Sequence, residues 1–361
     1  MDLRSLVALS ALTGLSRSRA FAVFKELRAQ SHAVTLDEVI AYAAPGANVE
    51  RIAAEARDQA ALLIAAGIRA GISPIDIDHA HYPPLLRTIP DPPTVLWCAG
   101  RPEALLQPGV ANVGSRAATA YALEVAARLA AELAERGLAV VSGLARGADG
   151  AAHRGCLEGG GTTIAVLGSG PDRIYPPEHD ALAVSICKNG ALVSEHGPGV
   201  PPLPDHFPLR NRLISGISLA VVVVEANEKS GSLITARCAL EQGRDVMAVP
   251  GSVLGGRNRG SHALLKDGAK VVEAADDILE ELGWPAPAEA VGRGDAKISG
   301  NLLNSDELLH KLTPGESYDL DEISATVGLT GSNLLPRLTE WEMRGQLVKV
   351  AGGRYVLAGR N

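Results

Sequence analysis

Aromatic side chains and an excess of basic charge are both scarce in this sequence. Phe, Trp and Tyr make up only 3% of the 361 residues, which argues against a broad aromatic platform for stacking bases. The 34 Lys and Arg residues are outnumbered by 41 Asp and Glu residues, so the net charge is −7. Any affinity for nucleic acid must therefore come from local clustering of basic residues.

Paired cysteines and long hydrophobic runs are also missing. The four cysteines form no CxxC pair, which excludes a zinc finger or thioredoxin-like motif and fits a reducing compartment. The apolar run at 219–224 is far shorter than the roughly 20 residues of a membrane span. The N-terminal segment has no small-residue cleavage site, and Arg17 and Arg19 follow it. The sequence thus predicts a cytoplasmic protein without a membrane segment.

The central part of the chain alternates between short apolar runs and Ala-rich helical patterns. The runs are apolar at consecutive positions, as in parallel strands covered on both faces. They lie at 110–113, 138–141, 164–167, 191–193, 219–224 and 246–249. Helical patterns at 121–136 and 233–242 separate some of them. Over residues 73–284 we therefore expect an α/β fold with a doubly wound, mostly parallel, Rossmann-like sheet.

Two smaller regions are expected to flank this sheet. Residues 1–72 are helical, and the pattern around 9–20 resembles the helix-hairpin-helix of a SAM-like domain, whose turn amides can meet a DNA phosphate. A Pro- and Gly-containing linker spans 285–301.

Residues 302–361 are typical of a winged-helix domain. Helices are expected at 321–327 and 333–344, and strands at 347–350 and 355–357 flank Gly352-Gly353 as in a hairpin. This region has six basic and eight acidic residues. Because a major-groove reader should be basic, an accessory or protein-interaction role is favoured over the alternative, duplex recognition.

The ends of the expected strands are rich in Gly, Ser and Arg. Gly114-Ser115-Arg116 follows the first run, Ser142–Asp149 the second and Gly168–Gly170 the third. Glycine lets backbone amides approach an anion, a helix N-terminus adds a favourable dipole, and arginine neutralises charge. Three such loops at one edge of a sheet predict an anion site, most plausibly for phosphate.

Two further segments add to this site. In Phe207–Gly216, Arg210 and Arg212 flank Asn211, and Phe207 offers a ring face to a base or an arginine. The run Lys229–Ala236 supplies a Gly/Ser loop that opens a helix, although its serines could serve only as N-caps.

At these residues the chain resembles the DNA-processing protein A family (DprA/Smf). The similar stretches are Gly114–Arg116, Ser142–His153, Tyr175–His179, Phe207–Ser218, Ser230–Ala236 and Ala248–Gly251. The resemblance implies a protein that binds single-stranded DNA, protects incoming DNA and loads the RecA recombinase in natural transformation. It also implies a homodimer, and it makes the single-strand-binding protein a further candidate partner.

The resemblance assigns DNA-binding roles to specific residues. Arg116, Arg210 and Arg212 would meet phosphates as exposed side chains, and Phe207 would stack on a base. The pocket would be shaped by Gly114, Ser115, Gly143, Asn211 and Ser232, and Lys229 belongs to the same set.

An enzyme is the alternative hypothesis. Nucleoside-monophosphate phosphoribohydrolases share this type of fold, and Glu195 and Glu225 lie at strand ends. The Pro-Gly-Gly-x-Gly-Thr loop of that group is absent, however, as are a catalytic triad order, a metal-spaced His cluster and a Walker lysine loop. We expect both glutamates to pair with arginines, and Asp149 and His153 to form a capping or packing pair. The expectation is a non-enzymatic protein that needs neither cofactor nor metal.

Overall fold

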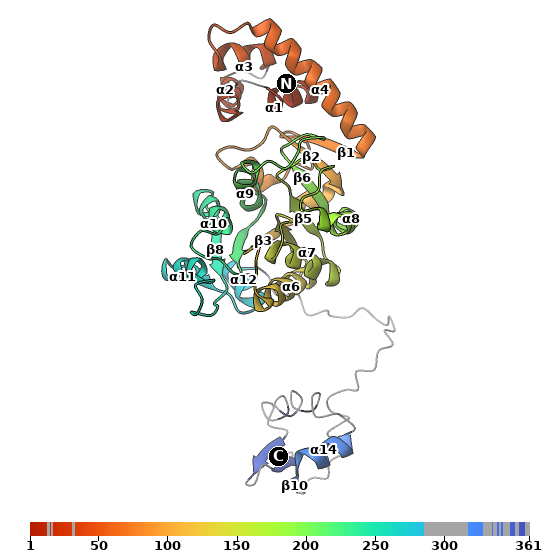
Figure 1. Ribbon diagram of the computed structural model, residues 1–361, viewed down its shortest axis with the longest axis vertical. Coiled ribbons are helices and arrows are strands. Elements are labelled where there is room, and N and C mark those ends of the chain that lie inside the picture. The colour runs from red at the N-terminus through yellow and green to blue at the C-terminus, as the bar shows by residue number, and fades with distance from the viewer. Residues whose placement is uncertain are drawn as a thin grey trace. The chain divides into compact units, whose positions relative to one another are not determined.

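The computed structural model describes residues 1–12, 15, 17–30 and 33–284, together with 317–327, 334, 338, 341, 347–350 and 354–357. The chain divides into two compact units, residues 1–288 and 289–361, which are described separately (Figure 1). The linker expected at 285–301 and the turn residues 13, 14 and 16 of the expected helix-hairpin-helix lie outside the described residues.

The first unit combines helices with a nine-stranded sheet. Its helices are α1 (Leu3–Ser10), α2 (Arg17–Gln30), α3 (Leu36–Ala43), α4 (Val49–Ala70), α5 (Pro84–Arg87), α6 (Ala120–Glu135), α7 (Ala148–Glu158), α8 (Asp180–Asn189), α9 (His206–Ile217), α10 (Ser232–Glu241), α11 (Arg259–Lys266) and α12 (Ala275–Glu281), with 3-10 helices η1 (Pro102–Leu106) and η2 (Pro177–His179). Its strands are β1 (Ile72–Asp76), β2 (Val95–Gly100), β3 (Gly109–Val113), β4 (Ala139–Ser142), β5 (Thr163–Val166), β6 (Ala191–Ser194), β7 (Ala220–Val223), β8 (Asp245–Ala248) and β9 (Lys270–Val271).

The strand order is β1-β2-β6-β5-β4-β3-β7-β8-β9. Strands β3 to β9 pair in parallel, whereas β2 pairs antiparallel with both β1 and β6. The expected α/β fold with a mostly parallel sheet is therefore confirmed, and the six apolar runs form β3 to β8. Strand β1 escaped the sequence pattern because it is an edge strand that contains Pro74 and polar residues, as edge strands tolerate.

The central strands are apolar at consecutive positions because both faces of the sheet are covered. Val110, Val140 and Val222 pack against α6, α7 and α12 on one face. Ala111 and Val221 point to the other face, where α9 and α10 cover them. Figure 1 shows α6, α7 and α12 lying close together beside the sheet. Neighbouring residues of a strand thus enter two different core layers.

The four N-terminal helices pack together beyond β1 and β2 (Figure 1). Helix α3 begins with a capping box, in which Thr35 and Glu38 satisfy each other's backbone amides. Helix α4 ends at Gly71, whose φ of 66° permits the left-handed turn into β1. Residues of α1 to α4 share one apolar core cluster with β1 and β2. The helices are thereby fixed to one edge of the sheet.

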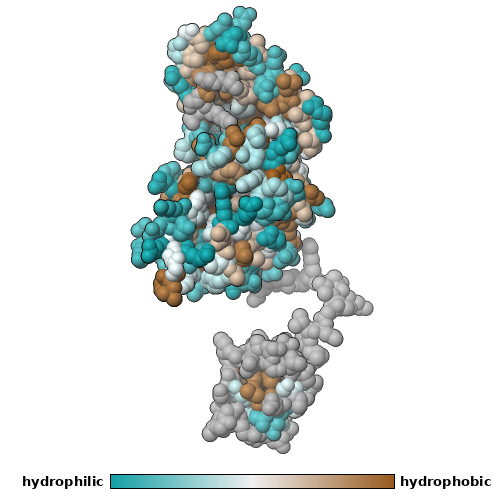
Figure 2. Space-filling model, in the orientation of Figure 1, coloured by the Kyte–Doolittle hydropathy of each residue, from teal (hydrophilic) through white to brown (hydrophobic). Residues whose placement is uncertain are grey.

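The surface of this unit is mixed in polarity. On the face in view in Figure 2, apolar residues form small groups between polar ones over the described part of the chain. No helix in the described part combines the length and apolar character needed to span a membrane.

In the second unit the structure describes β10 (Ser317–Tyr318), α14 (Leu320–Val327), β11 (Leu347–Val350) and β12 (Arg354–Leu357), in the sheet order β10-β12-β11. The expected helix at 321–327 and both hairpin strands are confirmed. Leu334, Leu338 and Trp341 are buried with Ile323 and Tyr355 in a small core. Their spacing of four and three residues is that of one helix face. The rest of the helix expected at 333–344 lies outside the described residues.

Candidate functional site

The candidate site lies where the strand order of the sheet reverses. Strand β3 pairs with β4 on one side and with β7 on the other, so the loops after β3 and β7 diverge in opposite directions. Such a switch point leaves a crevice at the carboxyl ends of parallel strands. A cavity of about 640 Å³ opens there, lined by residues 113–117, by most of the segment from Asn227 to Thr235 and by the first turns of α9. The Gly-rich ends of β3 and β4 both contribute to this crevice, whereas Gly168–Gly170 after β5 does not line it.

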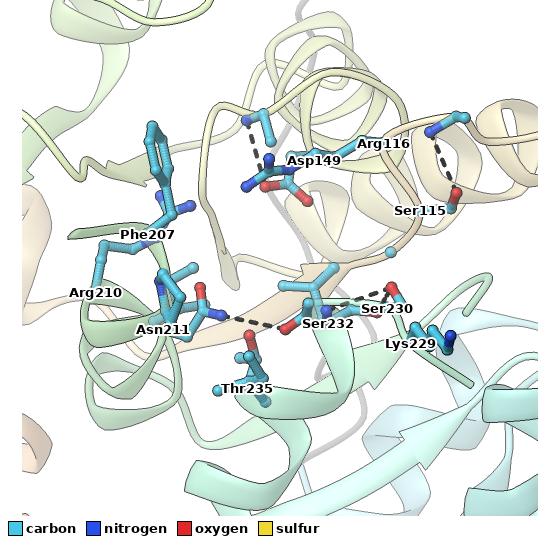
Figure 3. Close-up of a pocket in the computed structure, with 18 of the residues that line it drawn as sticks. Ser115, Arg116, Asp149, Phe207, Arg210, Asn211, Lys229, Ser230, Ser232 and Thr235 are labelled. Carbon is cyan, nitrogen blue, oxygen red and sulfur yellow. Dashed lines mark hydrogen bonds between the residues drawn. The ribbon is translucent and has the colours of Figure 1, made fainter. Parts of the chain in front are cut away.

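The loop after β3 presents Arg116 to the cavity. Gly114 lies so close to α7 that a Cβ would meet the Ala148 Cβ at 2.7 Å, which explains the need for glycine. The Ser115 hydroxyl accepts a hydrogen bond from the Ala117 amide at 3.2 Å and so closes the turn. Arg116 is exposed, and its Cζ lies 5.3 Å from the centroid of the Phe207 ring (Figure 3). Within the described chain, no acidic side chain forms an ion pair with Arg116, so its charge is available to a ligand.

The turn after β4 is held by buried polar groups. One carboxylate oxygen of Asp149 accepts hydrogen bonds from the amides of Gly143 at 3.1 Å and Ala145 at 3.4 Å. Burial raises the pKa of Asp149, and the nearby Arg210 charge and these amides oppose that rise. Asp149 is thus a structural residue of the cavity wall.

His153 supports the same turn as a neutral imidazole. Its Nε2 accepts from the Leu144 amide at 3.3 Å, and its Nδ1 lies 2.7 Å from the Thr163 hydroxyl, which donates to the Val140 carbonyl. Burial lowers the pKa of His153 to about 3. Asp149 and His153 were expected to form a capping or packing pair. Both are buried and hold the turn after β4, but they do so through separate hydrogen bonds.

Arg210 lies beneath the cavity rather than on an open surface. It is only 3% exposed, and its Nη1 donates to the Gly143 carbonyl at 2.8 Å and also to the Val166 carbonyl. Burial lowers the pKa of Arg210 to about 10, so it stays protonated at neutral pH. Gly143 must be glycine here, because a Cβ would lie 2.6 Å from this guanidinium. The expectation that Arg210 is exposed was wrong, because its side chain extends from α9 to carbonyl groups at the ends of β4 and β5.

Arg212 does not line this cavity. Its Nη2 donates to a Glu195 carboxylate oxygen at 2.8 Å, and its Nε lies 3.6 Å from Asp91. The Arg212 side chain is 19% exposed and that of Glu195 is 6% exposed. The expectation of a free, exposed Arg212 was also wrong, whereas the expected pairing of Glu195 with an arginine is confirmed.

Asn211 connects the two walls of the cavity. Its Nδ2 donates to the Gly231 carbonyl at 3.1 Å, which joins α9 to the loop after β7 (Figure 3). Phe207, one turn earlier on the same helix, is half-buried and turns its ring toward the cavity. Asn211 is 8% exposed and therefore acts mainly in positioning.

The loop after β7 supplies a lysine and a helix N-terminus. Lys229 is exposed, and the hydroxyls of Ser230 and Ser232 lie 2.7 Å apart. Helix α10 begins at Ser232 without a side-chain cap, and this end faces the cavity. Its first amides already have acceptors, because Ser232 donates to the Ser230 hydroxyl, and Leu233 and Ile234 donate to the carbonyls of Ser230 and Gly231. The positive end of the helix dipole nevertheless favours an anion here. The loop thus combines three features that bind phosphate groups.

Glu225 lies two residues after the end of β7, and its hydrogen-bond partner is one that the sequence did not predict. Its carboxylate accepts from the Thr119 hydroxyl at 2.7 Å and from the Thr119 amide at 3.3 Å. The expected arginine partner is therefore replaced by the start of α6. Because Glu225 is only 2% exposed, it secures the loop after β3 instead of facing the cavity.

Of the ten residues predicted for the site, the structure brings eight to the cavity wall: Gly114, Ser115, Arg116, Phe207, Arg210, Asn211, Lys229 and Ser232. Gly143 lies directly behind Arg210, and Arg212 lies elsewhere. Ser230 and Thr235 also line the cavity, in the segment Lys229–Ala236 that the sequence singled out, whereas Tyr175 was not predicted as a site residue. Tyr175 follows the Gly-rich end of β5, a signal that could have found it. The described residues contain no group of three or more side chains suited to holding a metal ion.

Comparison with known proteins gives a consistent result. Residues 73–283 match the model of the family described as DNA recombination-mediator protein A. The chain is 41% identical to Protein Smf of Escherichia coli over 286 residues, covering 77% of this chain and 76% of that protein. It is 46% identical to DNA processing protein DprA of Bacillus subtilis over 222 residues, covering 61% and 74%.

Two solved structures resemble this one. The structure of DNA processing protein A from Streptococcus pneumoniae matches with a TM-score of 0.70 at 36% identity, covering 78% of this chain and 98% of that chain. The Helicobacter pylori protein, whose structure is described as showing a single-stranded DNA binding mode, matches with a TM-score of 0.53 at 30% identity, covering 58% and 95%.

Proposed function

The chain belongs to the DNA recombination-mediator protein A (DprA/Smf) family, and we propose that the cavity between β3 and β7 is where it binds single-stranded DNA. The chief support is the convergence of Arg116, Lys229 and the N-terminus of α10 on one cavity that also exposes the Phe207 ring. Positive charge and an aromatic face in one groove are the combination that binds single strands without sequence preference. The Helicobacter pylori relative provides a precedent for the ligand.

The cavity residues divide into contact and support roles. Arg116 and Lys229 are exposed and meet phosphates, while the positive end of the α10 dipole and the Ser232 hydroxyl favour a further phosphate oxygen. Phe207 stacks on a base. Arg210 contributes its charge from below, because it is buried yet protonated.

Arg212 has no contact with DNA in this proposal. Its partners are Glu195 and Asp91, outside the cavity wall. Gly114, Ser115, Gly143 and Asn211 hold the loops in place.

The hydrogen-bond partners of the two buried glutamates, Glu195 and Glu225, favour a DNA-binding protein over a hydrolase. A phosphoribohydrolase needs a carboxylate that reaches its substrate. Both carboxylate oxygens of Glu225 instead accept hydrogen bonds from Thr119, and Glu195 pairs with Arg212. The role that we propose is that of a recombination mediator.

The partners follow from the family. We propose that the protein acts as a homodimer and delivers the bound strand to RecA. In doing so it either displaces the single-strand-binding protein from the strand or binds the strand beside it. We further propose an organisation into a helical region 1–72, the DNA-binding region 73–284, a linker 285–301 and a winged-helix domain 302–361. The core of Ile323, Leu334, Leu338, Trp341 and Tyr355 supports the last of these.

Titration of the full chain with single-stranded and duplex oligonucleotides of the same sequence tests the proposal. Tight, sequence-tolerant and salt-sensitive binding of the single strand, with weaker duplex binding, is expected. Equal binding of both forms, or release of adenine from AMP by the purified protein, would contradict it.

A further inference from the structure

Four side chains, three from loops and one from the first turn of α9, make consecutive contacts along the edge of the sheet. They alternate between cation and ring, in the order Arg116, Phe207, Tyr175 and Arg146. The Arg116 Cζ lies 5.3 Å from the Phe207 centroid, and the Phe207 and Tyr175 centroids are 5.5 Å apart. The Arg146 Cζ lies 6.0 Å from the Tyr175 centroid. We call this row the stacking row.

The stacking row leads away from the phosphate-binding loops. Arg116 follows β3, Arg146 follows β4, and Tyr175 lies between β5 and η2. These strands are adjacent in the order β5-β4-β3-β7, and Lys229 follows β7 on the opposite side of β3. Neighbouring strands are about 4.8 Å apart, so the path from Lys229 to Tyr175 crosses about 14 Å of the sheet edge. A strand held at Lys229 and Arg116 is therefore directed along the row.

Tyr175 and Arg146, the two residues of the stacking row that lie furthest from Arg116, are available to a ligand. Tyr175 is 40% exposed and lines the cavity, unlike the buried Phe21, Phe24 and Tyr82. The Arg146 side chain is 53% exposed and pairs with Glu178, whose side chain is 50% exposed. An ion pair as exposed as this one contributes little to stability. A phosphate can therefore take the place of the carboxylate without disturbing the fold.

The geometry of the two rings limits how bases can bind. Their planes are inclined at 57°, so bases that stack on Phe207 and on Tyr175 are themselves inclined to one another. The two rings therefore serve two different bases, and the bound strand must bend between them.

We propose that Tyr175 and Arg146 form a second nucleotide subsite, in which Tyr175 stacks on the base following the one at Phe207 and Arg146 meets a phosphate. This inference rests on the proposed binding of single-stranded DNA at the cavity. It assigns a direction to the strand across the ends of β3, β4 and β5, and it makes the affinity depend on oligonucleotide length.

Binding of an oligo(dT) series of about 4 to 16 nucleotides, the usual range of single-strand site sizes, tests this subsite. Tyr175→Ala should bind the long oligonucleotides roughly 5- to 150-fold more weakly, the loss expected for one stacked base, and the shortest with wild-type affinity. Tyr175→Phe should restore long-oligonucleotide affinity. Tyr42→Ala is the matched control, because Tyr42 is a 65% exposed tyrosine on α3.

Two further measurements separate stacking from a structural effect. Arg146→Ala should lower the log–log salt slope by about 0.7 on long oligonucleotides, the value for one phosphate of a single strand. An oligonucleotide carrying one 5-iododeoxyuridine should photocross-link to Tyr175 when the label occupies the second subsite.

The outcomes distinguish the subsite from the main cavity. Phe207→Ala should weaken binding at every length. If it does so while Tyr175→Ala binds all lengths as the wild type does and no Tyr175 cross-link forms, the subsite is refuted and the cavity stands. If folded Phe207→Ala binds normally at all lengths, the proposed function itself fails.

Discussion

Arg210 and Arg212 lie two residues apart on α9 and point to opposite sides of it. Arg210 reaches the carbonyls of Gly143 and Val166, while Arg212 reaches the carboxylates of Glu195 and Asp91. A separation of two residues turns the side-chain direction by about 200° on a helix. Helix α9 thus places Arg210 beneath the cavity, while Arg212 forms ion pairs away from the cavity wall.

Arg212→Ala should therefore destabilise the protein. The substitution leaves the nearly buried carboxylate of Glu195 without its cation, a loss of about 3 kcal/mol in the free energy of unfolding. Urea denaturation measures this. The affinity of the folded fraction for single-stranded DNA should stay unchanged. A stable variant with weakened DNA binding would place Arg212 in the binding site after all.

Gly143→Ala should also reduce stability, for a steric reason. The new Cβ would lie 2.6 Å from a guanidinium that cannot move away, because Arg210 is buried and donates to two carbonyls. We expect a loss of about 1–3 kcal/mol, typical of overpacking. Gly231→Ala is the control, since nothing lies within 4 Å of its Cβ position. Equal melting temperatures for the two variants would contradict this role for Gly143.

His153 should make the stability of the fold sensitive to mild acid. Burial lowers its folded-state pKa to about 3 from 6.5, so between these values the unfolded chain binds the extra proton. The free energy of unfolding therefore falls as the pH falls through this window, by about 1 kcal/mol between pH 7 and pH 5.5.

The control for this effect is His153→Gln. It should be less stable at pH 7, because the hydrogen bonds to Leu144 and Thr163 are altered, but it should lose about 1 kcal/mol less than the wild type on acidification. The same pH dependence in both proteins would assign the effect to other histidines.

Much of the fold could be predicted from the sequence because parallel strands covered on both faces leave an unambiguous pattern. The runs that form β3 to β8 are apolar at every position except Asn112, and glycines at their ends are required by close approaches such as that of Gly114 to Ala148. Edge strand β1 lacks that pattern, because Ser73 is exposed and Pro74 and Asp76 are only partly buried.

The sequence predicted most residues of the site, but it did not predict where the side chains of Arg210 and Arg212 point. The sequence shows that Arg210 and Arg212 are near the strand ends, but their exposure depends on which buried carboxylates and carbonyls α9 packs against. Glu195 and Asp91 lie 17 and 121 residues away from Arg212, so no local pattern reveals that pairing. Tyr175 was overlooked for the same reason: its ring contacts that of Phe207 on α9, which lies 32 residues further along the chain.

The salt dependence of single-strand binding by Arg116 variants is the most direct test of the cavity as the DNA site. Arg116→Ala should lose about 1.5–3 kcal/mol of binding free energy, and its log–log salt slope should fall by about 0.7, at an unchanged melting temperature. Arg116→Lys should retain the salt slope and lose less affinity than Arg116→Ala, because lysine keeps the positive charge but lacks the two parallel N–H donors of the guanidinium. Arg101→Ala, which removes a 54% exposed arginine outside the cavity, is the control. If Arg116→Ala is folded and binds with the affinity and slope of the wild type, DNA does not bind in this cavity.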